Sequence, residues 1–228
     1  MATSKSTQTS QKPLRADAAR NRERILDAAR ELFEQRGLDA PLDEVATRAG
    51  VGAATLYRRF PSRESLVEAV LLEKMELWLT ATEAALENED PWGAFCGLMD
   101  WLCATMAADR GFSDLISIRL PLSDKATHLR ERGEQATALL IRRAQDAGRL
   151  RTDFVMEDVL LFLTANAGVM QVTQADAPHA WRRLLAYLLE GCRSDRTGPL
   201  PAAPTPLQME RALTGNACAK GFGAGHRN

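Results

Sequence analysis

The sequence of 228 residues lacks a long hydrophobic run and carries almost no net charge. Without a stretch of about 18 consecutive apolar residues, it predicts no membrane-spanning helix and no membrane partner. The formal net charge is −1, so binding to a polyanion can be argued only from where the basic residues lie. Residues 1–12 are rich in Ser, Thr and Gln without an apolar core, which predicts no secretory signal and a cytoplasmic protein.

Cysteine is scarce, and its spacing excludes the common metal-binding motifs. No Cys-x-x-Cys pair occurs among Cys96, Cys103, Cys192 and Cys218, so we expect reduced thiols, no metal site and no cofactor. On one helix, Cys96 and Cys103 would lie about 10 Å apart, which is beyond the reach of a disulfide bond. A redox-sensing protein acting through Cys96 or Cys103 would therefore need a partner such as Cys192.

The alternation of polar and apolar residues that is typical of β-strands is also missing. Nearly all of the chain between its two ends has helical periodicity, so the predicted fold class is all-α. Composition predicts disorder in the polar residues 1–14 and in the proline- and glycine-containing tail, residues 195–228. Between these tails we expect a three-helix N-terminal domain at residues 15–65 and a helical domain at residues 66–194.

The stretch from Val45 to Arg63 is the most informative part of the chain. Its pattern indicates a short helix, a tight turn at Gly50, a second short helix and a break at Pro61. It contains no acidic residue, and a small cationic helix pair fits a DNA major groove. Arginine can neutralise phosphates, and Thr or Tyr hydroxyls can donate hydrogen bonds to them. The candidate contacts are Arg48, Thr55, Tyr57, Arg58, Arg59 and Arg63.

The alternative for these arginines is an ordinary solvated surface, and the alternative for Tyr57 is packing alone. Pattern, spacing and order nevertheless agree with one known domain. Residues 37–46, 49–51 and 55–66 resemble the N-terminal domain of TetR-family transcriptional regulators, and the similarity covers about residues 20–72.

This resemblance implies a homodimer that binds a pseudo-palindromic operator in double-stranded DNA and releases it when a small ligand enters the C-terminal domain. It also implies that residues 53–60 form the recognition helix, with Arg48 and Arg63 at the flanking phosphates. Residues 143–153 and 188–191 are similar to one C-terminal subtype of the family.

Two positions depart from the usual pattern of this family. Ala53 and Ala54 stand where many members carry polar side chains, so they can approach the groove or touch a thymine methyl group without forming a side-chain hydrogen bond. Base reading would then depend more on Thr55, Arg58 and Arg59 and on the shape of the DNA. Pro41 stands where a Ser or Thr often caps the second helix and touches phosphate.

Aromatic and sulfur-containing residues are enriched in the middle of the chain. For each of them alone, packing in a helical core is the simpler interpretation. Together they can line a pocket between helices, where small-molecule sites often form and where methionine adapts to varied shapes. The candidate ligand-binding residues are Met99, Trp101, Met106, Phe112 and Phe162.

The segment 159–170 is apolar nearly all round, so we expect it to be buried on several sides. Small residues within it permit close helix packing, and the next predicted helix, over residues 178–193, adds a further apolar stripe. We expect both helices to form a four-helix bundle with their copies in a homodimer. The candidate interface residues are Leu161, Ala165, Gly168, Trp181, Leu184, Leu185 and Leu188.

The sequence therefore predicts a ligand-responsive, dimeric DNA-binding regulator that acts as a repressor and responds to a small hydrophobic effector. A redox-sensing regulator acting through Cys96 or Cys103 is one alternative. An all-helical enzyme is another, although the sequence shows no pairing of a nucleophile with a base. We thus expect no catalytic residues. The effector, the operator sequence and the regulated genes are left open by the sequence.

Overall fold

The computed structural model describes residues 11–116, 123–196 and 198–219, with side chains from residue 17 to residue 217. These parts contain helices and no strand, which confirms the all-α prediction. None of the described helices combines the length and apolarity needed to cross a bilayer. The helices are α1 (Gln11–Arg36), α2 (Leu42–Arg48), α3 (Ala53–Arg59), α4 (Arg63–Leu86), α5 (Pro91–Ala108), α6 (Arg110–Ile116), α7 (Asp124–Asp146), α8 (Met156–Thr173), α9 (Ala180–Gly191) and α10 (Pro206–Ala219).

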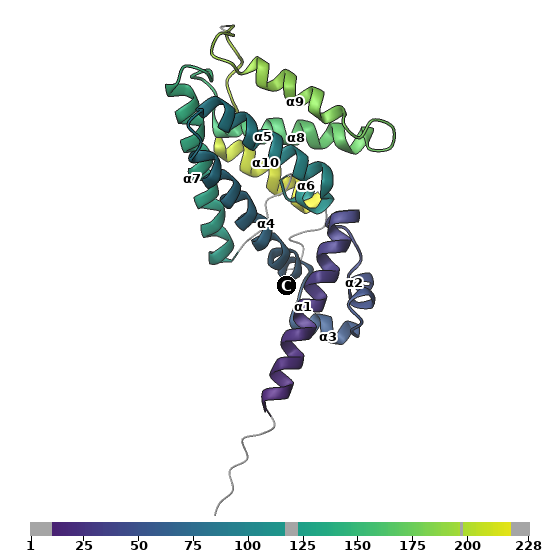
Figure 1. The fold of residues 1–228 in the computed structure, drawn as a ribbon. Helices are drawn as coiled ribbons and strands as arrows, with labels where there is room; N and C mark the ends of the chain where they lie inside the picture. Colours follow the sequence, from purple (N-terminus) through teal and green to yellow (C-terminus); the bar gives the residue numbers. More distant parts are fainter. Residues whose placement is uncertain (1–10, 117–122, 197, 220–228) are drawn as a thin grey trace, which may run out of the picture.

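Helices α1, α2 and α3 form the small domain at the lower end of the molecule in Figure 1. Gly37 ends α1 with a φ of +79°, and Gly50 makes the turn after α2 with a φ of +61°. Both values lie in the left-handed region that glycine adopts without a steric penalty. Apolar side chains from all three helices meet in one core that includes Phe33, Val45 and Leu56. The two turns and this shared core therefore fix the orientation of α3 relative to α1 and α2.

Helix α4 connects this small domain to the rest of the chain. Its first turn is held by a capping box, because the Ser62 hydroxyl accepts from the Ser65 amide while the Ser65 hydroxyl accepts from the Ser62 amide. The N-terminal part of α4 buries Leu66 and Val70 in the core of the small domain. Its later part packs along α7, so one helix belongs to both domains (Figure 1).

Helices α5 to α9 form the larger domain around a second core. Phe95, Met99 and Trp181 lie at its centre and are almost fully buried. Helices α8 and α9 pack against each other, and both contact α5, while α8 also contacts α7. An isolated antiparallel β-bridge joins Leu150, which precedes α8, to Arg193, which follows α9.

Two ends of the chain are more ordered than composition predicts. Helix α1 begins at Gln11, so residues 11–14 are helical, while residues 1–10 lie outside the described part. In the predicted C-terminal tail, residues 206–219 form α10. The Thr205 and Gln208 side chains cap its first turn, and Pro206 stands at the first helical position, where its missing donor costs little.

The reason for this order is a short apolar stripe on α10. Met209 is half-buried, and Leu213 and Ala217 are buried. Ala217 joins the cluster that forms the core of the small domain. The prediction of a wholly disordered tail over residues 195–228 is therefore wrong for residues 206–219, while residues 220–228 lie outside the described part.

Candidate functional site

Helix α3 presents a small, mostly polar face to solvent. It points Leu56 inward, where that side chain is buried in the core. Of the predicted DNA contacts on this helix, Ala53, Ala54, Tyr57 and Arg58 are exposed, and Thr55 and Arg59 are half-buried. The Tyr57 side chain is 48% exposed, so it is not a core residue. The helix can therefore bring both small and hydrogen-bonding side chains against a flat or grooved partner.

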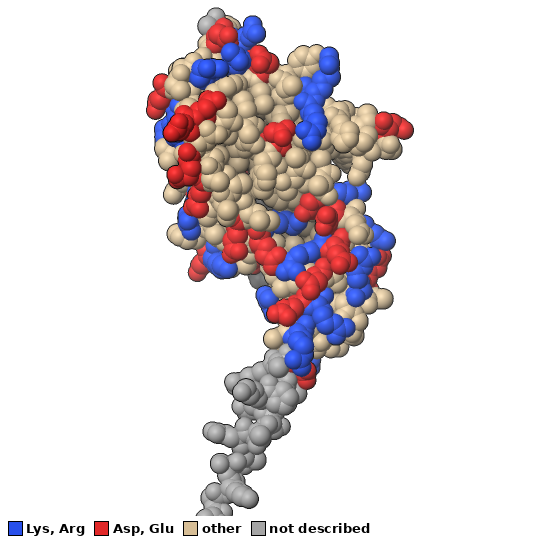
Figure 2. Space-filling model, viewed as in Figure 1, with Lys and Arg blue, Asp and Glu red and all other residues tan. Residues whose placement is uncertain are grey.

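The arginines around α3 differ in whether they already form hydrogen bonds or ion pairs within the protein. Arg58 has no hydrogen bond or ion pair within the described residues. Arg48 is paired with Glu31 at 3.1 Å, and Arg24 donates to the Gly50 carbonyl at 3.1 Å. Figure 2 shows Lys and Arg gathered over the lower end of the small domain and interleaved with Asp and Glu. Arg58 is thus the predicted contact whose charge is most available.

Arg63 has a structural role that sequence reasoning did not anticipate. Its Nη1 donates to the carbonyl oxygens of Leu38 and Ala40 at 2.7 and 2.9 Å. It also borders a shallow hollow that is shared with Pro41 and Tyr57. Contact with DNA phosphate stays a prediction for Arg63, but the guanidinium already ties α4 to the turn between α1 and α2.

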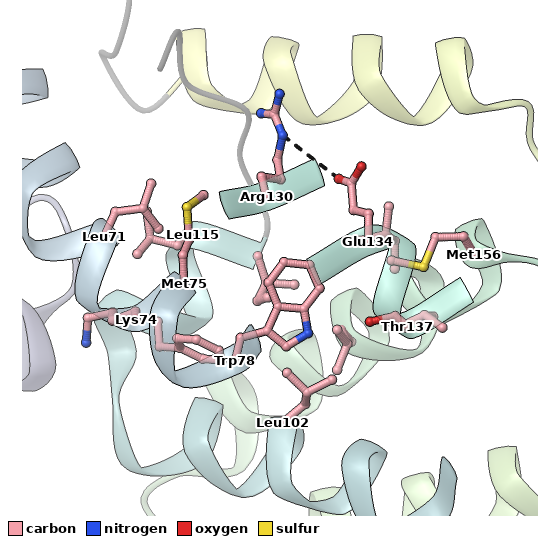
Figure 3. Close-up of a pocket in the computed structure, with 15 residues that line it drawn as sticks. Leu71, Lys74, Met75, Trp78, Leu102, Leu115, Arg130, Glu134, Thr137 and Met156 are labelled. Carbon is pink, nitrogen blue, oxygen red and sulfur yellow. Dashed lines mark ion pairs between the residues drawn. The ribbon is translucent and has the colours of Figure 1, made fainter. Parts of the chain in front are cut away.

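The larger domain contains an apolar cavity of about 100 Å³ between α4, α5, α6, α7 and α8 (Figure 3). Its wall consists mainly of aliphatic, methionine and aromatic side chains, joined by a few polar groups. The lining residues include Leu71, Lys74, Met75, Trp78, Leu102, Phe112, Leu115, Ile116, Arg130, Glu134, Thr137, Met156, Val159, Leu160 and Leu163.

Of the five predicted ligand-binding residues, only Phe112 lines this cavity. Met99 and Met106 are buried in the core behind the wall, so they do not reach the cavity. Trp101 packs edge-on against Phe112 at 6.4 Å, and Phe162 packs edge-on against Phe154 at 5.6 Å. These four residues therefore do not line this cavity, and their contacts are those of core packing.

The charged groups at the cavity are paired with each other or with near neighbours. Lys74 forms an ion pair with Asp109, and both side chains are largely buried. Arg130 lies 3.9 Å from Glu134, one turn further along α7. Thr137 donates its hydroxyl hydrogen to the Gly133 carbonyl at 2.8 Å. The cavity is thus an apolar space with a polar edge.

Helix α6 lies between the cavity and the small domain. Phe112, Leu115 and Ile116 face the cavity, while the Asp114 carboxylate accepts a hydrogen bond of 2.9 Å from the Leu38 amide. The contact is close, because a Cβ at Gly37 would lie 2.3 Å from Asp114 Oδ2. A movement of α6 caused by a change in the cavity would therefore reach the turn that positions α2.

The outer faces of α8 and α9 separate the predicted dimer residues into two groups. Leu161, Ala165 and Gly168 are exposed, and Leu184 and Leu188 are half-buried. Trp181 and Leu185 are only 2% and 3% exposed, because they pack into the core of their own chain. These two residues are therefore not available to contact a second copy, and exposed Tyr187 and Val172 extend the apolar face instead.

The cysteines lie in environments that suppress their reactivity. Burial raises the pKa of Cys96 to about 11, that of Cys103 to about 12 and that of Cys192 to about 12. A thiol is nucleophilic only as the thiolate, so these side chains are weak nucleophiles near neutral pH. Among the described residues, no three His, Cys, Asp or Glu side chains are placed to hold a metal ion.

Two family models match the chain, and together they cover both domains. Residues 25–70 match the bacterial regulatory proteins of the tetR family, and residues 90–194 match the C-terminal domain of SbtR-like transcriptional regulators. A crystal structure of a TetR transcriptional regulator from Streptomyces coelicolor is 30% identical. The match covers 75% of this chain and 98% of that chain with a TM-score of 0.50. The chain belongs to the TetR family. It is a DNA-binding transcriptional regulator and not an enzyme, as the sequence predicts.

Other TetR-type matches cover less of the sequence or only the fold. An HTH-type transcriptional regulator of Staphylococcus aureus is 32% identical over 68 residues, which are 29% of this chain and 37% of that protein. The chain thus spans little more than a third of that curated relative. FadR from Bacillus subtilis, solved in complex with stearoyl-CoA, is 17% identical with a TM-score of 0.55, over 74% of this chain and 98% of FadR. This likeness concerns the fold alone.

Proposed function

We propose that this TetR-family regulator is a repressor that binds a pseudo-palindromic operator as a homodimer and is released by a small hydrophobic effector. The observation that carries the proposal is the placement of α6. The same short helix lines the cavity through Phe112, and its Asp114 carboxylate accepts a hydrogen bond from the Leu38 amide. Cavity and DNA-binding domain are therefore joined by one element.

On the DNA side, α3 would enter the major groove with Ala53, Ala54 and Thr55 near the bases. Arg58 and Arg59 would reach bases or phosphates, and Tyr57 would donate its hydroxyl hydrogen to a phosphate oxygen. Arg48 would meet the flanking backbone after leaving Glu31, and Arg63 would do so from the start of α4. Exposure of Tyr57 and Arg58 supports these roles.

A homodimer is supported by the apolar outer face of α8 and α9. Leu161, Val172 and Tyr187 are exposed large side chains on these two helices, and Ala165 and Gly168 allow a second helix to approach closely. Covering this face with the same face of a second copy would form a four-helix bundle. Two α3 helices would then read half-sites about 34–36 Å apart, and their binding free energies would roughly add.

The effector would occupy the cavity of about 100 Å³. An engineered apolar cavity of about 150 Å³ holds benzene, so a cavity of about 100 Å³ limits the buried part of a ligand to at most about one ring. Two regulators that share the fold were solved with stearoyl-CoA and with resorcinol. The first of these ligands is far larger than the cavity described here, whereas a single ring is of the right size.

In this mechanism the effector favours a dimer whose recognition helices no longer match the groove spacing. Filling the cavity would displace Phe112 and Leu115, and α6 would carry Asp114 with it. The Leu38 amide and the start of α2 would follow because Asp114 holds that turn. The shift in DNA binding can be no larger than the difference in effector affinity between the two states.

The experiment that tests this function captures operator DNA. The purified protein is unfolded and refolded to strip any bound ligand, then mixed with fragmented genomic DNA of its source. We expect sequencing of the bound fragments to reveal an inverted repeat that two copies of the chain occupy. A protein that is folded and dimeric but enriches no repeat would contradict the proposal.

A further inference from the structure

The indole of Trp78 is held in one orientation by the opposite helix. A Cβ at Gly133 of α7 would lie 2.4 Å from Trp78 Cζ3 and 2.7 Å from Cε3 and Cη2. The edge of the six-membered ring therefore rests on the Gly133 backbone. The nitrogen lies on the other side of the ring system, so the N–H group faces away from Gly133. Figure 3 shows this nitrogen turned toward Leu102 and Thr137.

The Trp78 N–H group is a donor without a partner, because no hydrogen bond to it exists within the described residues. Indole nitrogen donates but does not accept, so this group can be satisfied only by an acceptor. In the lining of an apolar cavity, an unused donor marks the place where a ligand can supply an acceptor.

Thr137 supplies the complementary group at the same end of the cavity. Its hydroxyl hydrogen is committed to the Gly133 carbonyl at 2.8 Å, and the residue is buried. The oxygen of a hydroxyl that donates still has lone pairs, so Thr137 Oγ1 can accept a hydrogen bond. Trp78 and Thr137 thus offer one donor and one acceptor in the lining of the same cavity.

Among the described residues, no uncompensated charge lies at this end of the cavity. Lys74 is neutralised by Asp109, and its amine points away from the indole (Figure 3). Arg130 and Glu134 form their own pair at 3.9 Å on the side away from Leu102, where both are partly exposed. A ligand carboxylate beside Trp78 would lose its hydration without gaining a cation, which is costly.

We propose that the cavity binds a small, neutral, mainly apolar molecule of about one ring that carries a hydroxyl group. The hydroxyl oxygen accepts from the Trp78 N–H group, and its hydrogen is donated to Thr137 Oγ1. The cavity volume of about 100 Å³ sets the size of the apolar part. This assignment rests on the proposed function only in naming the molecule an effector, since the binding itself is measured without DNA.

Isothermal calorimetry on the full chain tests the assignment with three probes of one shape. These are p-cresol, which has the hydroxyl, toluene, which lacks it, and 4-methylbenzoate, which is charged. We expect p-cresol to bind about tenfold to thirtyfold more tightly than toluene, as two buried hydrogen bonds provide, and 4-methylbenzoate to bind most weakly.

Two substitutions locate the hydrogen bonds. Trp78→Phe keeps an aromatic ring against Gly133 and removes the N–H group, so the preference for p-cresol over toluene should fall by about threefold to tenfold, while the hydrogen bond to Thr137 remains. Thr137→Val keeps the shape of the side chain and removes the acceptor, so it should weaken the binding of p-cresol. The affinity for 4-methylanisole, whose oxygen can accept a hydrogen bond but not donate one, should stay unchanged. Trp92→Phe is the matched control, because Trp92 stacks on Phe95 at 5.9 Å and neither residue lines the cavity. The preference of this variant for p-cresol over toluene should equal that of the unmodified protein.

Equal affinities for p-cresol and toluene, tightest binding of 4-methylbenzoate, or no binding of any probe would each overturn the assignment. So would a p-cresol preference over toluene that is undiminished in Trp78→Phe. A separate titration adds p-cresol to the protein bound to its operator. If p-cresol binds through Trp78 but leaves the DNA bound, the ligand class stands and the effector role in the proposed function fails.

Discussion

The carboxylate of Asp114 accepts a hydrogen bond of 2.9 Å from the backbone amide of Leu38, which lies 76 residues earlier in the chain. The acceptor stands on α6 between residues that line the cavity, and the donor stands in the turn before α2. The contact therefore connects the two domains at a point where each has a functional surface.

Asp114→Ala should weaken the contact between these two domains. The Leu38 amide would lose a charged acceptor, and we expect the free energy of unfolding to fall by about 1–3 kcal/mol. Urea denaturation followed by circular dichroism measures this change. Asp39→Ala is the control, because Asp39 is exposed in the same turn and carries the same charge. Equal effects of the two substitutions would show that the Asp114 contact contributes nothing of its own.

Arg58→Ala and Arg63→Ala should fail in different ways. Arg58 has no partner within the described residues, so Arg58→Ala should weaken DNA binding and leave the melting temperature unchanged. The slope of the logarithm of the binding constant against the logarithm of the salt concentration should fall in magnitude by about one, because one phosphate contact is lost. Loss of Arg63 leaves the Leu38 and Ala40 carbonyls without their donor, so the melting temperature should also fall. Fluorescence anisotropy and thermal unfolding of both variants check this pair, and a stable Arg63→Ala protein would contradict it.

Leu161→Glu should dissociate the homodimer. Leu161 is 43% exposed on the outer face of α8, and a charge there would be buried against the same face of a second copy. Light scattering during size-exclusion chromatography should give the mass of one chain. Leu77→Glu is the matched control, because Leu77 is 62% exposed on α4, away from this face. A Leu161→Glu protein that stays dimeric would place the interface elsewhere.

The cysteines should react slowly with alkylating reagents at neutral pH. Because the pKa of Cys96 is raised to about 11, its thiol stays protonated at pH 8. The thiolate fraction should then grow about tenfold per pH unit up to pH 10. Iodoacetamide labelling of a Cys218→Ser variant, followed by mass spectrometry, gives the rate at each pH. A plateau below pH 9 would indicate a reactive thiol and favour the redox-sensing alternative.

Sequence reasoning placed the DNA-binding helices well because their signals are local. Gly50 needs a positive φ, Pro61 stops a helix, and helical periodicity puts Leu56 inside while Tyr57 and Arg58 lie outside. None of these features depends on distant parts of the chain, and all of them are readable within a window of a few turns.

The cavity could not be located in this way. It forms where α4 meets α7, and periodicity shows that Trp78 and Thr137 lie on apolar faces without showing what those faces meet. The same limit applies to Trp181 and Leu185, because the apolar stripe of α9 is wide enough to serve the core and an outer surface.

Helix α10 was missed for a different reason. The capping pattern of Thr205, Pro206 and Gln208 was readable in the sequence, but the prolines and glycines around it suggested disorder. The stripe of Met209, Leu213 and Ala217 is short, and composition does not reveal that Ala217 joins the core of the small domain.

The central claim is that the cavity and the DNA-binding surface are coupled, and this can be tested before the effector is known. Coupling between two sites is reciprocal, so operator binding must alter the cavity as much as an effector alters DNA binding. Amide hydrogen exchange is measured with and without the captured operator DNA. We expect changed exchange in α6 and in the part of α4 that lines the cavity, in addition to protection of α2 and α3. Changes confined to residues 20–63 would contradict the account.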